Sequence, residues 1–231
     1  MIHTFGFPDP RETSDHGLVA VGGSYHPRML IAAYASGIFP WPLRGMPHAW
    51  FSPNPRMILR PRDLHVPRRL EKTIRQGRFR VTWDTAFERV IRGCAAAYRP
   101  GQGGTWINGE LIRGFLELHR LGVAHSVETW HRGRLAGGLY GVSLGAMFGG
   151  ESMFFRQRDA SKVAFVALVE RLRDWGFHFL DCQIHTGHLE LFGAQEWPRD
   201  RFLDALARAL DEPTRRGPWT LADGARDVDG S

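Results

Sequence analysis

The sequence predicts an α+β fold with a central, mostly antiparallel sheet that is flanked by helices. Two helical segments are followed by three consecutive strand-like segments with short turns between them, which is typical of an antiparallel meander. An apolar helix and one further buried strand come next, so helices and strands do not alternate strictly. The region before this pattern is rich in glycine, proline and aromatic residues. We therefore expect a small N-terminal domain over residues 1–60 and a larger domain over residues 61–231.

The N-terminal domain is expected to contain one short helix and two rigid loops. The helix runs from Pro27 to Ser36, with proline in its first turn, and Gly37 ends it. Prolines interrupt the aromatic clusters at 39–42 and 50–53, which predicts loops that display large rings. The alternative is that these rings fill an interface between the two domains.

The larger domain is expected to begin with a strand and two helices that have side-chain caps. Asp84 and Asn108 each precede a helical pattern, and their side-chain oxygens can accept hydrogen bonds from first-turn N–H groups. A flexible loop is expected over 100–104, and a loose tail from Asp211 onward, where the composition becomes polar. The predicted strands cover 79–83, 124–130, 134–144, 146–155 and 177–184, and the predicted helices cover 84–98, 108–120, 161–175 and 198–210.

Bulk composition indicates a globular protein. Of the 231 residues, 43% are hydrophobic, which is enough for a well-buried core. The chain has no stretch of about 18 uncharged apolar residues and no signal-peptide pattern at its start, so we expect no membrane span. Cys94 and Cys182 are its two cysteines, too few for a disulfide framework. A reducing cytoplasm is the expected location.

Basic residues are concentrated in one stretch. The formal net charge is +6, and residues 56–80 hold nine basic residues against two acidic ones, a local sum of +7 that leaves −1 for the rest of the chain. Arginine forks bind phosphate oxygens bidentately, so such a patch suits a polyanion-binding surface. The alternative is a solvated, highly charged connection. The residues expected to contact nucleic acid are Arg62, Arg68, Arg69, Lys72, Arg75 and Arg78.

The order of elements in the larger domain resembles the acyltransferase fold of the GCN5-related N-acetyltransferases. A set of short segments follows in order from about residue 5 to residue 210: Gly17-Leu18 with Gly22-Gly23, Ala33-Tyr34 with 37–41, 50–56, 105–107, 125–128, 137–141, 150–154, 160–162 and 181–183. Together these segments resemble the leucyl/phenylalanyl-tRNA–protein transferase family. The chain departs from that family's usual pattern at Ser24, Phe51, Phe155 and Trp197, and we expect Phe155 to narrow or reshape the site.

The resemblance implies an aminoacyltransferase with no cofactor. It would move leucine, phenylalanine or methionine from aminoacyl-tRNA to the α-amine of proteins that begin with Arg or Lys, and so mark them for N-end-rule degradation. The α-amine has a pKa near 8 and the ester is already activated, so the enzyme mainly needs positioning, one proton acceptor and donors to the oxyanion. The implied partners are charged tRNA and the acceptor protein, with no CoA and no membrane.

Asp181 and Gln183 are the candidate catalytic residues. Residues two apart in a strand share a face, so both side chains are expected to point into one site, with Leu180 and Cys182 turned to the apolar interior. The carboxylate would orient the amide, and the amide oxygen would receive an N–H of the attacking amine. The alternative is that Asp181 only caps the following loop.

Glu151 is the candidate for binding the acceptor's cation, because a carboxylate in a buried strand needs a partner. The substrate amine and an internal arginine are the alternative partners. Trp50 and Trp106 are expected to stack on the terminal adenine or frame the side chain, with Phe51 beside them. Each residue of the expected apolar pocket is equally suited to a plain core. The pocket residues are Leu139, Phe148, Met153, Leu168 and Leu180.

Three rival interpretations are weaker. A CoA-dependent acetyltransferase needs a glycine-containing pyrophosphate loop, and the run 156–161 has no glycine and includes Asp159. A noncatalytic RNA-binding module explains the basic stretch but not a buried Glu151. A zinc site at Cys182, His185 and His188 lacks a second thiol pair, so no metal is expected.

Overall fold

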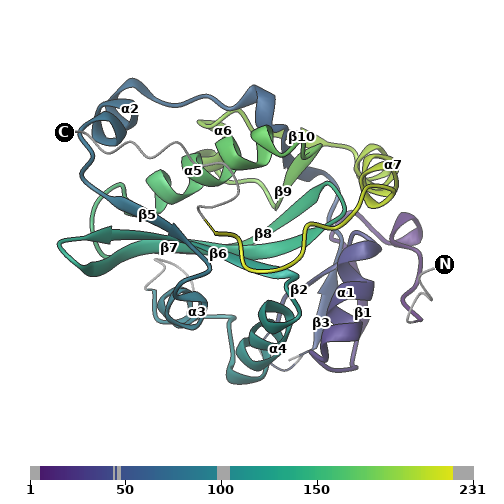
Figure 1. The fold of residues 1–231 in the computed structure, drawn as a ribbon. Coiled ribbons are helices and arrows are strands. Elements are labelled where there is room, and N and C mark those ends of the chain that lie inside the picture. The colour runs from purple at the N-terminus through teal and green to yellow at the C-terminus, as the bar shows by residue number, and fades with distance from the viewer. Residues whose placement is uncertain (1–5, 44, 46–47, 98–104, 221–231) are drawn as a thin grey trace.

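The computed structural model describes residues 6–43, 45, 48–97 and 105–220, and it confirms the predicted α+β fold. A mixed seven-stranded sheet with helices on both faces forms its centre (Figure 1). Every pairing in this sheet is antiparallel except that of β8 with β9, which is parallel. In sheet order the strands are β10 (Gln195–Trp197), β4 (Arg56–Leu59), β9 (Phe179–Gln183), β8 (Met147–Phe155), β7 (Arg134–Leu144), β6 (Ala124–His131) and β5 (Arg80–Trp83).

Helices cover the two faces of this sheet unequally. The longest helix, α5, lies across β6, β7 and β8 on one face, with α2 beside it, while α3, α4 and α1 pack on the other face (Figure 1). A buried apolar cluster fills each interface. The helices are α1 (Pro27–Ala35), α2 (Arg68–Arg75), α3 (Phe87–Ala95), α4 (Gly109–Arg120), α5 (Ala160–Asp174), α6 (Gly187–Glu190) and α7 (Arg199–Leu210), and short 3-10 turns cover Pro10–Glu12 and Pro61–Asp63.

The aromatic-proline clusters are part of a small sheet, so the prediction of two displaying loops is wrong. β1 (Leu18–Val21), β3 (Ala49–Phe51) and β2 (Phe39–Pro40) form this sheet, with β3 in the middle. Pro40 is tolerated because β2 lies at the edge, where one side needs no ladder hydrogen bond. Phe39 and Trp50 are buried. These two rings belong to the interior, while Trp41 and Phe51 are partly exposed, and the alternative of an interface between two domains stays a prediction.

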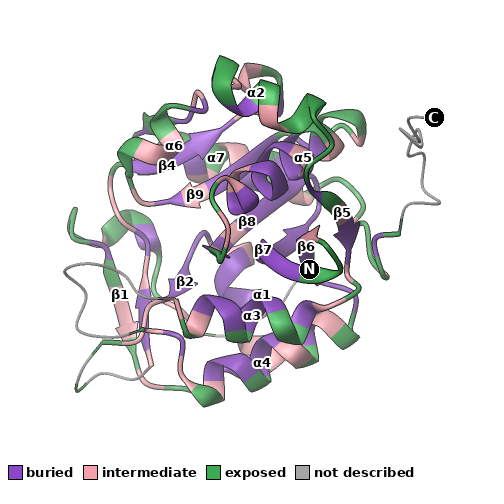
Figure 2. Cartoon of the chain, turned by 90° about the vertical axis from the view of Figure 1, so that its left-hand side faces the viewer, coloured by how far each residue is buried: buried purple, intermediate pink, exposed green. Residues whose placement is uncertain are grey.

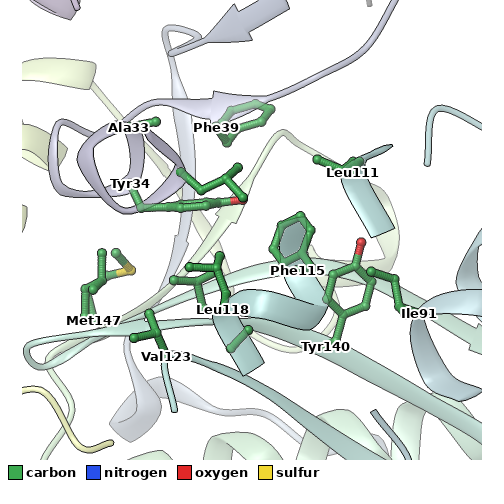
Figure 3. Packing of buried hydrophobic residues seen from close by; sticks show 14 of the residues in the cluster. Ala33, Tyr34, Phe39, Ile91, Leu111, Phe115, Leu118, Val123, Tyr140 and Met147 are labelled. Carbon is green, nitrogen blue, oxygen red and sulfur yellow. The ribbon is translucent and has the colours of Figure 1, made fainter. Parts of the chain in front are cut away.

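The core beneath α1 and α4 links this small sheet to the large one. Figure 3 shows the ring of Phe115 from α4 between Tyr34 of α1 and Tyr140 of β7. Tyr34 thus reaches from the N-terminal region into the packing of the large sheet. The predicted division at residue 60 stays a prediction, and β4, which precedes it, is a strand of the large sheet.

One of the two predicted helix caps is confirmed. Asn108 accepts a hydrogen bond from the backbone N–H of Leu111 and caps α4. Asp84 does not cap α3, which begins at Phe87 without a side-chain cap. Its carboxylate instead accepts hydrogen bonds from the N–H of Ser126 and from other groups in the core. The expected end of α3 at Tyr98 and the expected loop over 100–104 lie outside the described residues.

The segment that follows α7 is not a loose tail over the residues that the structure describes. Trp219 is buried, and its ring stacks on His125 with 3.8 Å between centroids. Its backbone N–H donates to Asp84 Oδ2 at 2.7 Å. The polar composition from residue 211 predicts exposure, but the segment contributes one large buried ring, and the hydroxyl of Thr214 accepts a hydrogen bond from the backbone N–H of Gly145.

Candidate active site

A cavity of about 260 Å³ opens where β8 and β9 separate. Their parallel pairing ends at Gly149 and Asp181. Beyond that point β8 pairs only with β7, and β9 pairs only with β4. Two strands that diverge in one sheet leave a gap that side chains from neighbouring elements must close. Here α5 closes it from one side, and residues from the N-terminal region close it from the other.

The walls of the cavity are mostly apolar, with a small polar group at the strand split. Glu151 is the one charged residue among its described lining residues, and Gln183 lies beside it. A largely apolar wall with a few convergent polar groups is typical of a small-molecule site. The lining residues are Pro40, Trp41, Trp106, Leu139, Tyr140, Gly150, Glu151, Ser152, Met153, Phe165, Leu168, Leu180, Cys182, Gln183, Ile184, Thr186 and Leu189.

Glu151 and Gln183 form the polar centre of this cavity. Gln183 Nε2 donates to Glu151 Oε1 at 2.6 Å. Because the amide nitrogen faces the carboxyl group, the amide oxygen of Gln183 is left to accept a proton donor from a substrate. The two residues come from the two separating strands, so the split in the sheet is what places them opposite each other.

Burial raises the pKa of Glu151 to about 8. Hydrogen bonding of Tyr34 and Gln183 acts in the opposite direction, but removal from water is the larger effect. The hydroxyl of Tyr34 is close enough to favour the charged form, although neither Tyr34 Oη nor Glu151 Oε2 reaches full hydrogen-bond geometry with another described group. The free site is therefore poised to gain a negative charge when a cation arrives.

Asp181 lies behind the cavity wall and is held by an arginine. Arg56 Nε and Nη2 donate to its two carboxylate oxygens at 2.8 and 2.7 Å, and both side chains are buried. The guanidinium of Arg56 lies against the rings of Phe39 and Phe202. Asp181 Oδ1 also accepts the backbone N–H of Gln183 at 2.9 Å. The pair thus fixes the backbone on which the Gln183 side chain is carried.

The prediction that Asp181 and Gln183 point together into one site is wrong. Leu180, Cys182 and Gln183 line the cavity, and Asp181 does not. Strict alternation fails because Gln183 has a φ of 66°, in the left-handed region, which turns its side chain back toward the cavity. A non-glycine residue in that conformation marks a functional position often enough to be informative.

The structure brings most of the other predicted site residues together. Trp106, Leu139, Met153, Leu168 and Leu180 all line the cavity. Trp50, Phe51 and Phe148 are not among its lining residues.

Packing explains why each of these three residues lies outside the cavity. Trp50 is fully buried and its indole N–H donates to the carbonyl oxygen of Gly22. Phe148 is fully buried against Trp219. Phe51 packs on Trp41 from outside the cavity, with 6.3 Å between ring centroids.

Trp41 is a lining residue that was not predicted from the sequence. Its ring lies 6.3 Å from that of Trp106, tilted by 32°, and both face the cavity. The signal was present in the cluster at 39–42, since an aromatic residue between two prolines is held rigidly. What the sequence does not reveal is that Trp106, 65 residues further on, closes the same cavity.

The predicted polyanion-binding residues form an exposed surface that we call the α2 surface. Its helix is anchored by the buried Leu70, which packs toward α5. Figure 2 shows the exposed residues along α2 above a buried central sheet. Arg56 of the same basic stretch is buried and paired, so it is not part of this surface. The α2 surface consists of Arg62, Arg68, Arg69, Lys72, Arg75 and Arg78.

The residues of the rival zinc site have other contacts. Cys182 lines the cavity, and burial raises the pKa of its thiol. His185 lies 3.6 Å from a carboxylate oxygen of Glu190, and the ring of His188 packs edge-on against Phe192. Across the described ranges, no group of three or more His, Cys, Asp or Glu residues is arranged so that it could hold a metal ion.

None of the described helices combines the length and apolar character of a membrane span.

Comparison with known proteins gives a consistent family match. A family model described as leucyl/phenylalanyl-tRNA protein transferase matches residues 58–207, and one for the N-terminal domain of the same family matches residues 23–54. Curated relatives named leucyl/phenylalanyl-tRNA–protein transferase include one from Myxococcus xanthus, 58% identical over 93% of this chain and 92% of the relative. A second relative, from Anaeromyxobacter sp. (strain K), is 59% identical over 93% of this chain and 92% of the relative. A third, from Oleidesulfovibrio alaskensis, is 54% identical over 95% of this chain and 91% of the relative.

Proposed function

Because the chain belongs to the leucyl/phenylalanyl-tRNA–protein transferase family, we propose that it transfers leucine or phenylalanine from aminoacyl-tRNA to proteins that begin with Arg or Lys. The reaction takes place in the cytoplasm and marks the acceptor for N-end-rule degradation. The observation that carries this proposal is the apolar cavity at the β8–β9 split, with Glu151 and Gln183 hydrogen-bonded inside it.

The chemistry is aminolysis of an ester. The neutral α-amine attacks the ester carbonyl carbon, a C–N bond forms, and the C–O bond to the ribose of the terminal adenosine breaks. One proton moves from the amine to the leaving ribose oxygen, so no cofactor is consumed. The amide oxygen of Gln183 accepts an N–H of the attacking amine and orients its lone pair. Asp181 is a positioning residue, because it holds the backbone N–H of Gln183 and does not line the cavity.

The donor's aminoacyl group occupies the apolar part of the cavity. Leu139, Phe165 and Leu168 enclose it on the α5 side, and flexible Met153 adapts to two side-chain shapes. Trp41 and Trp106 offer stacking surfaces to the terminal adenine at the other end.

The acceptor's positive side chain is recognised by Glu151. A cation within reach lowers the pKa of this carboxyl from about 8 and ionises it, which restores the charge that burial suppresses. An ionised Glu151 then accepts the Gln183 amide more strongly, since hydrogen bonds to charged groups are the stronger ones. Acceptor binding and the orientation of the amide are coupled in this way.

The α2 surface holds the tRNA body. Arg68 and Arg69 occupy the first turn of α2, where the helix dipole disfavours cations, so their placement does not serve helix stability. A CoA donor is disfavoured because Asp159, at the start of α5, sets a carboxylate where a pyrophosphate would lie. Aminoacyl-tRNA suits both features, since its phosphates lie outside the cavity.

The test is incubation with radiolabelled Leu-tRNA and four peptides that differ only in their first residue, Arg, Lys, Asp or Glu. We expect label on the Arg and Lys peptides alone. Label on the acidic peptides alone would overturn the acceptor assignment, and label on none would favour a noncatalytic RNA-binding protein.

A further inference from the structure

An exposed aromatic ring stands at the end of β8, between the cavity and the α2 surface. The last residue of that strand, Phe155, is 65% exposed, so it does not narrow the cavity as the sequence predicts. Met153, two residues earlier, lines the cavity. Residues two apart share a strand face and are separated by about 7 Å. The ring of Phe155 therefore continues the face of β8 that carries a cavity wall.

The pairing of β7 with β8 shows which face this is. Phe155 is opposite Gly137, and a Cβ on Gly137 would lie 2.8 Å from the Cβ of Ala160 in the first turn of α5. Cross-strand partners share a face, so Phe155 projects on the side of α5. Phe154 packs the other way, against Gly93 of α3.

Basic residues follow this ring in the chain, and two of them, Arg158 and Lys162, lie within 3.9 Å of the carboxylate of Asp159. With Arg156 they set three basic residues against one acidic residue, and the side chains of Arg158 and Lys162 are 67% and 42% exposed. Arg78 Nη2 donates to Gln157 Oε1 at 3.3 Å, which joins the loop between β8 and α5 to the α2 surface. Figure 1 shows α2 and this loop at the same end of the large sheet.

We propose that Phe155 is a stacking platform for an unpaired nucleotide near the acceptor end of the tRNA. The inference rests on the proposed function: with the ester in the cavity and the tRNA body on the α2 surface, the intervening nucleotides cross the end of β8. An aromatic ring accepts the face of any base, and flanking cations neutralise the phosphates. Stacking also covers a large apolar ring that the fold leaves in water.

The test compares two donors, leucyl-tRNA and 3′-O-leucyl-adenosine, which has no preceding nucleotide. We expect Phe155→Ala to raise the KM for leucyl-tRNA roughly 5- to 100-fold, the range that one stacked base gives. We expect kcat, and the KM for leucyl-adenosine, to stay unchanged. Phe155→Tyr, which keeps the ring, should behave like the wild type with both donors. The matched control is Leu121→Ala, which alters a 52% exposed apolar residue at the end of α4. This variant should leave the KM for both donors unchanged.

Two outcomes separate this inference from the function on which it rests. If the wild type uses leucyl-tRNA but Phe155→Ala leaves the KM for both donors unchanged, or raises both equally, the stacking platform is overturned and the transferase function stands. If the wild type transfers from neither donor, the proposed function itself is overturned. Rescue of the leucyl-tRNA KM by Phe155→Tyr supports a role of the ring rather than of the local fold.

Discussion

The buried pair of Arg56 and Asp181 is the residue-scale feature on which the site's geometry depends. Two charges removed from water are tolerated because both carboxylate oxygens accept hydrogen bonds and two rings cover the guanidinium. Their contribution lies in position: Asp181 also holds the N–H of Gln183. Neither residue needs to contact substrate for its loss to disturb the reaction.

We expect Asp181→Ala to lower the free energy of unfolding by about 3–5 kcal/mol, because it leaves Arg56 as an uncompensated buried charge. Urea denaturation measures this change. The matched control is Asp200→Ala, which breaks an exposed ion pair with Arg11 and should cost about 1 kcal/mol or less. Equal losses in the two variants would show that the buried pair is not structural.

Glu151 should make the stability of the protein depend on pH. Its pKa is about 8 in the fold against 4.5 as the ordinary value, so the folded state holds the proton more tightly than the unfolded state does. A raised carboxyl pKa gives stability that is fully present below pH 4.5 and is lost as the pH rises to 8.

We therefore expect Glu151→Gln, which cannot ionise, to gain stability relative to the wild type between pH 5 and pH 9, by about 3–5 kcal/mol. Free energies of unfolding at the two pH values give this difference. Glu196→Gln, at an exposed position, is the control and should change stability little at either pH. A difference for Glu151→Gln that is the same at both pH values would contradict the assignment.

At the scale of elements, α2 concentrates charge without contributing much to the core, since Leu70 is its one buried residue. Changing Arg68, Arg69 and Arg75 to Glu should raise the concentration of charged tRNA that transfer requires. The variant should also flatten the salt dependence of binding, by roughly 0.7–0.9 in log–log slope for each phosphate that is no longer neutralised. Binding titrations at several salt concentrations measure both effects.

The control for α2 reverses the same number of charges elsewhere, at Arg113, Arg120 and Arg208, which are exposed on α4 and α7. This variant has the same net charge but keeps the α2 surface. Similar losses of affinity in the two variants would indicate a response to net charge, and the α2 surface would then not be the tRNA site.

The largest buried side chain of the C-terminal segment is the ring of Trp219, and Thr214 and Arg215 add further contacts. Trp219 stacks on His125 and packs against Phe148, directly behind the strand that carries Glu151. We expect Trp219→Ala to lower the free energy of unfolding by about 3–5 kcal/mol, as large-to-small changes in cores do. A loss below about 1 kcal/mol in urea denaturation would mean that the segment is not held as the structure has it.

Local patterns were sufficient to predict most elements. The meander, α4 with its Asn108 cap and the strand with Asp181 all follow from periodicity and capping chemistry. The small N-terminal sheet was missed because prolines argue against strands, and only the edge position of β2 makes them acceptable. The burial of Trp219 was not predicted, because the composition of a segment gives its average polarity and does not show that one of its rings is buried.

The candidate site was predicted in its residue types more than in its geometry. Glu151 and Gln183 are unusual in buried strands, and that signal is local. The partner of Asp181 is 125 residues away, and the left-handed backbone at Gln183 has no sequence signature in a non-glycine residue. Contacts of that range depend on how the whole chain packs.

At the scale of the whole molecule, three separate regions of the chain line one cavity. The split between β8 and β9 supplies the polar centre, the N-terminal region adds Trp41, and the loop before α4 adds Trp106. The α2 surface and the end of β8 lie at one end of the same sheet (Figure 1). A long polyanion can therefore reach the cavity while its body stays outside.

The central claim is that the polar centre of the cavity carries the transfer. The most direct measurement is the single-turnover rate from radiolabelled Leu-tRNA to a peptide that begins with Arg, for the wild type, Gln183→Ala and the distant control Leu121→Ala. We predict transfer by the wild type and the control, and a loss of roughly 100-fold or more in Gln183→Ala with tRNA binding intact. Transfer by a folded Gln183→Ala at the wild-type rate would contradict the account.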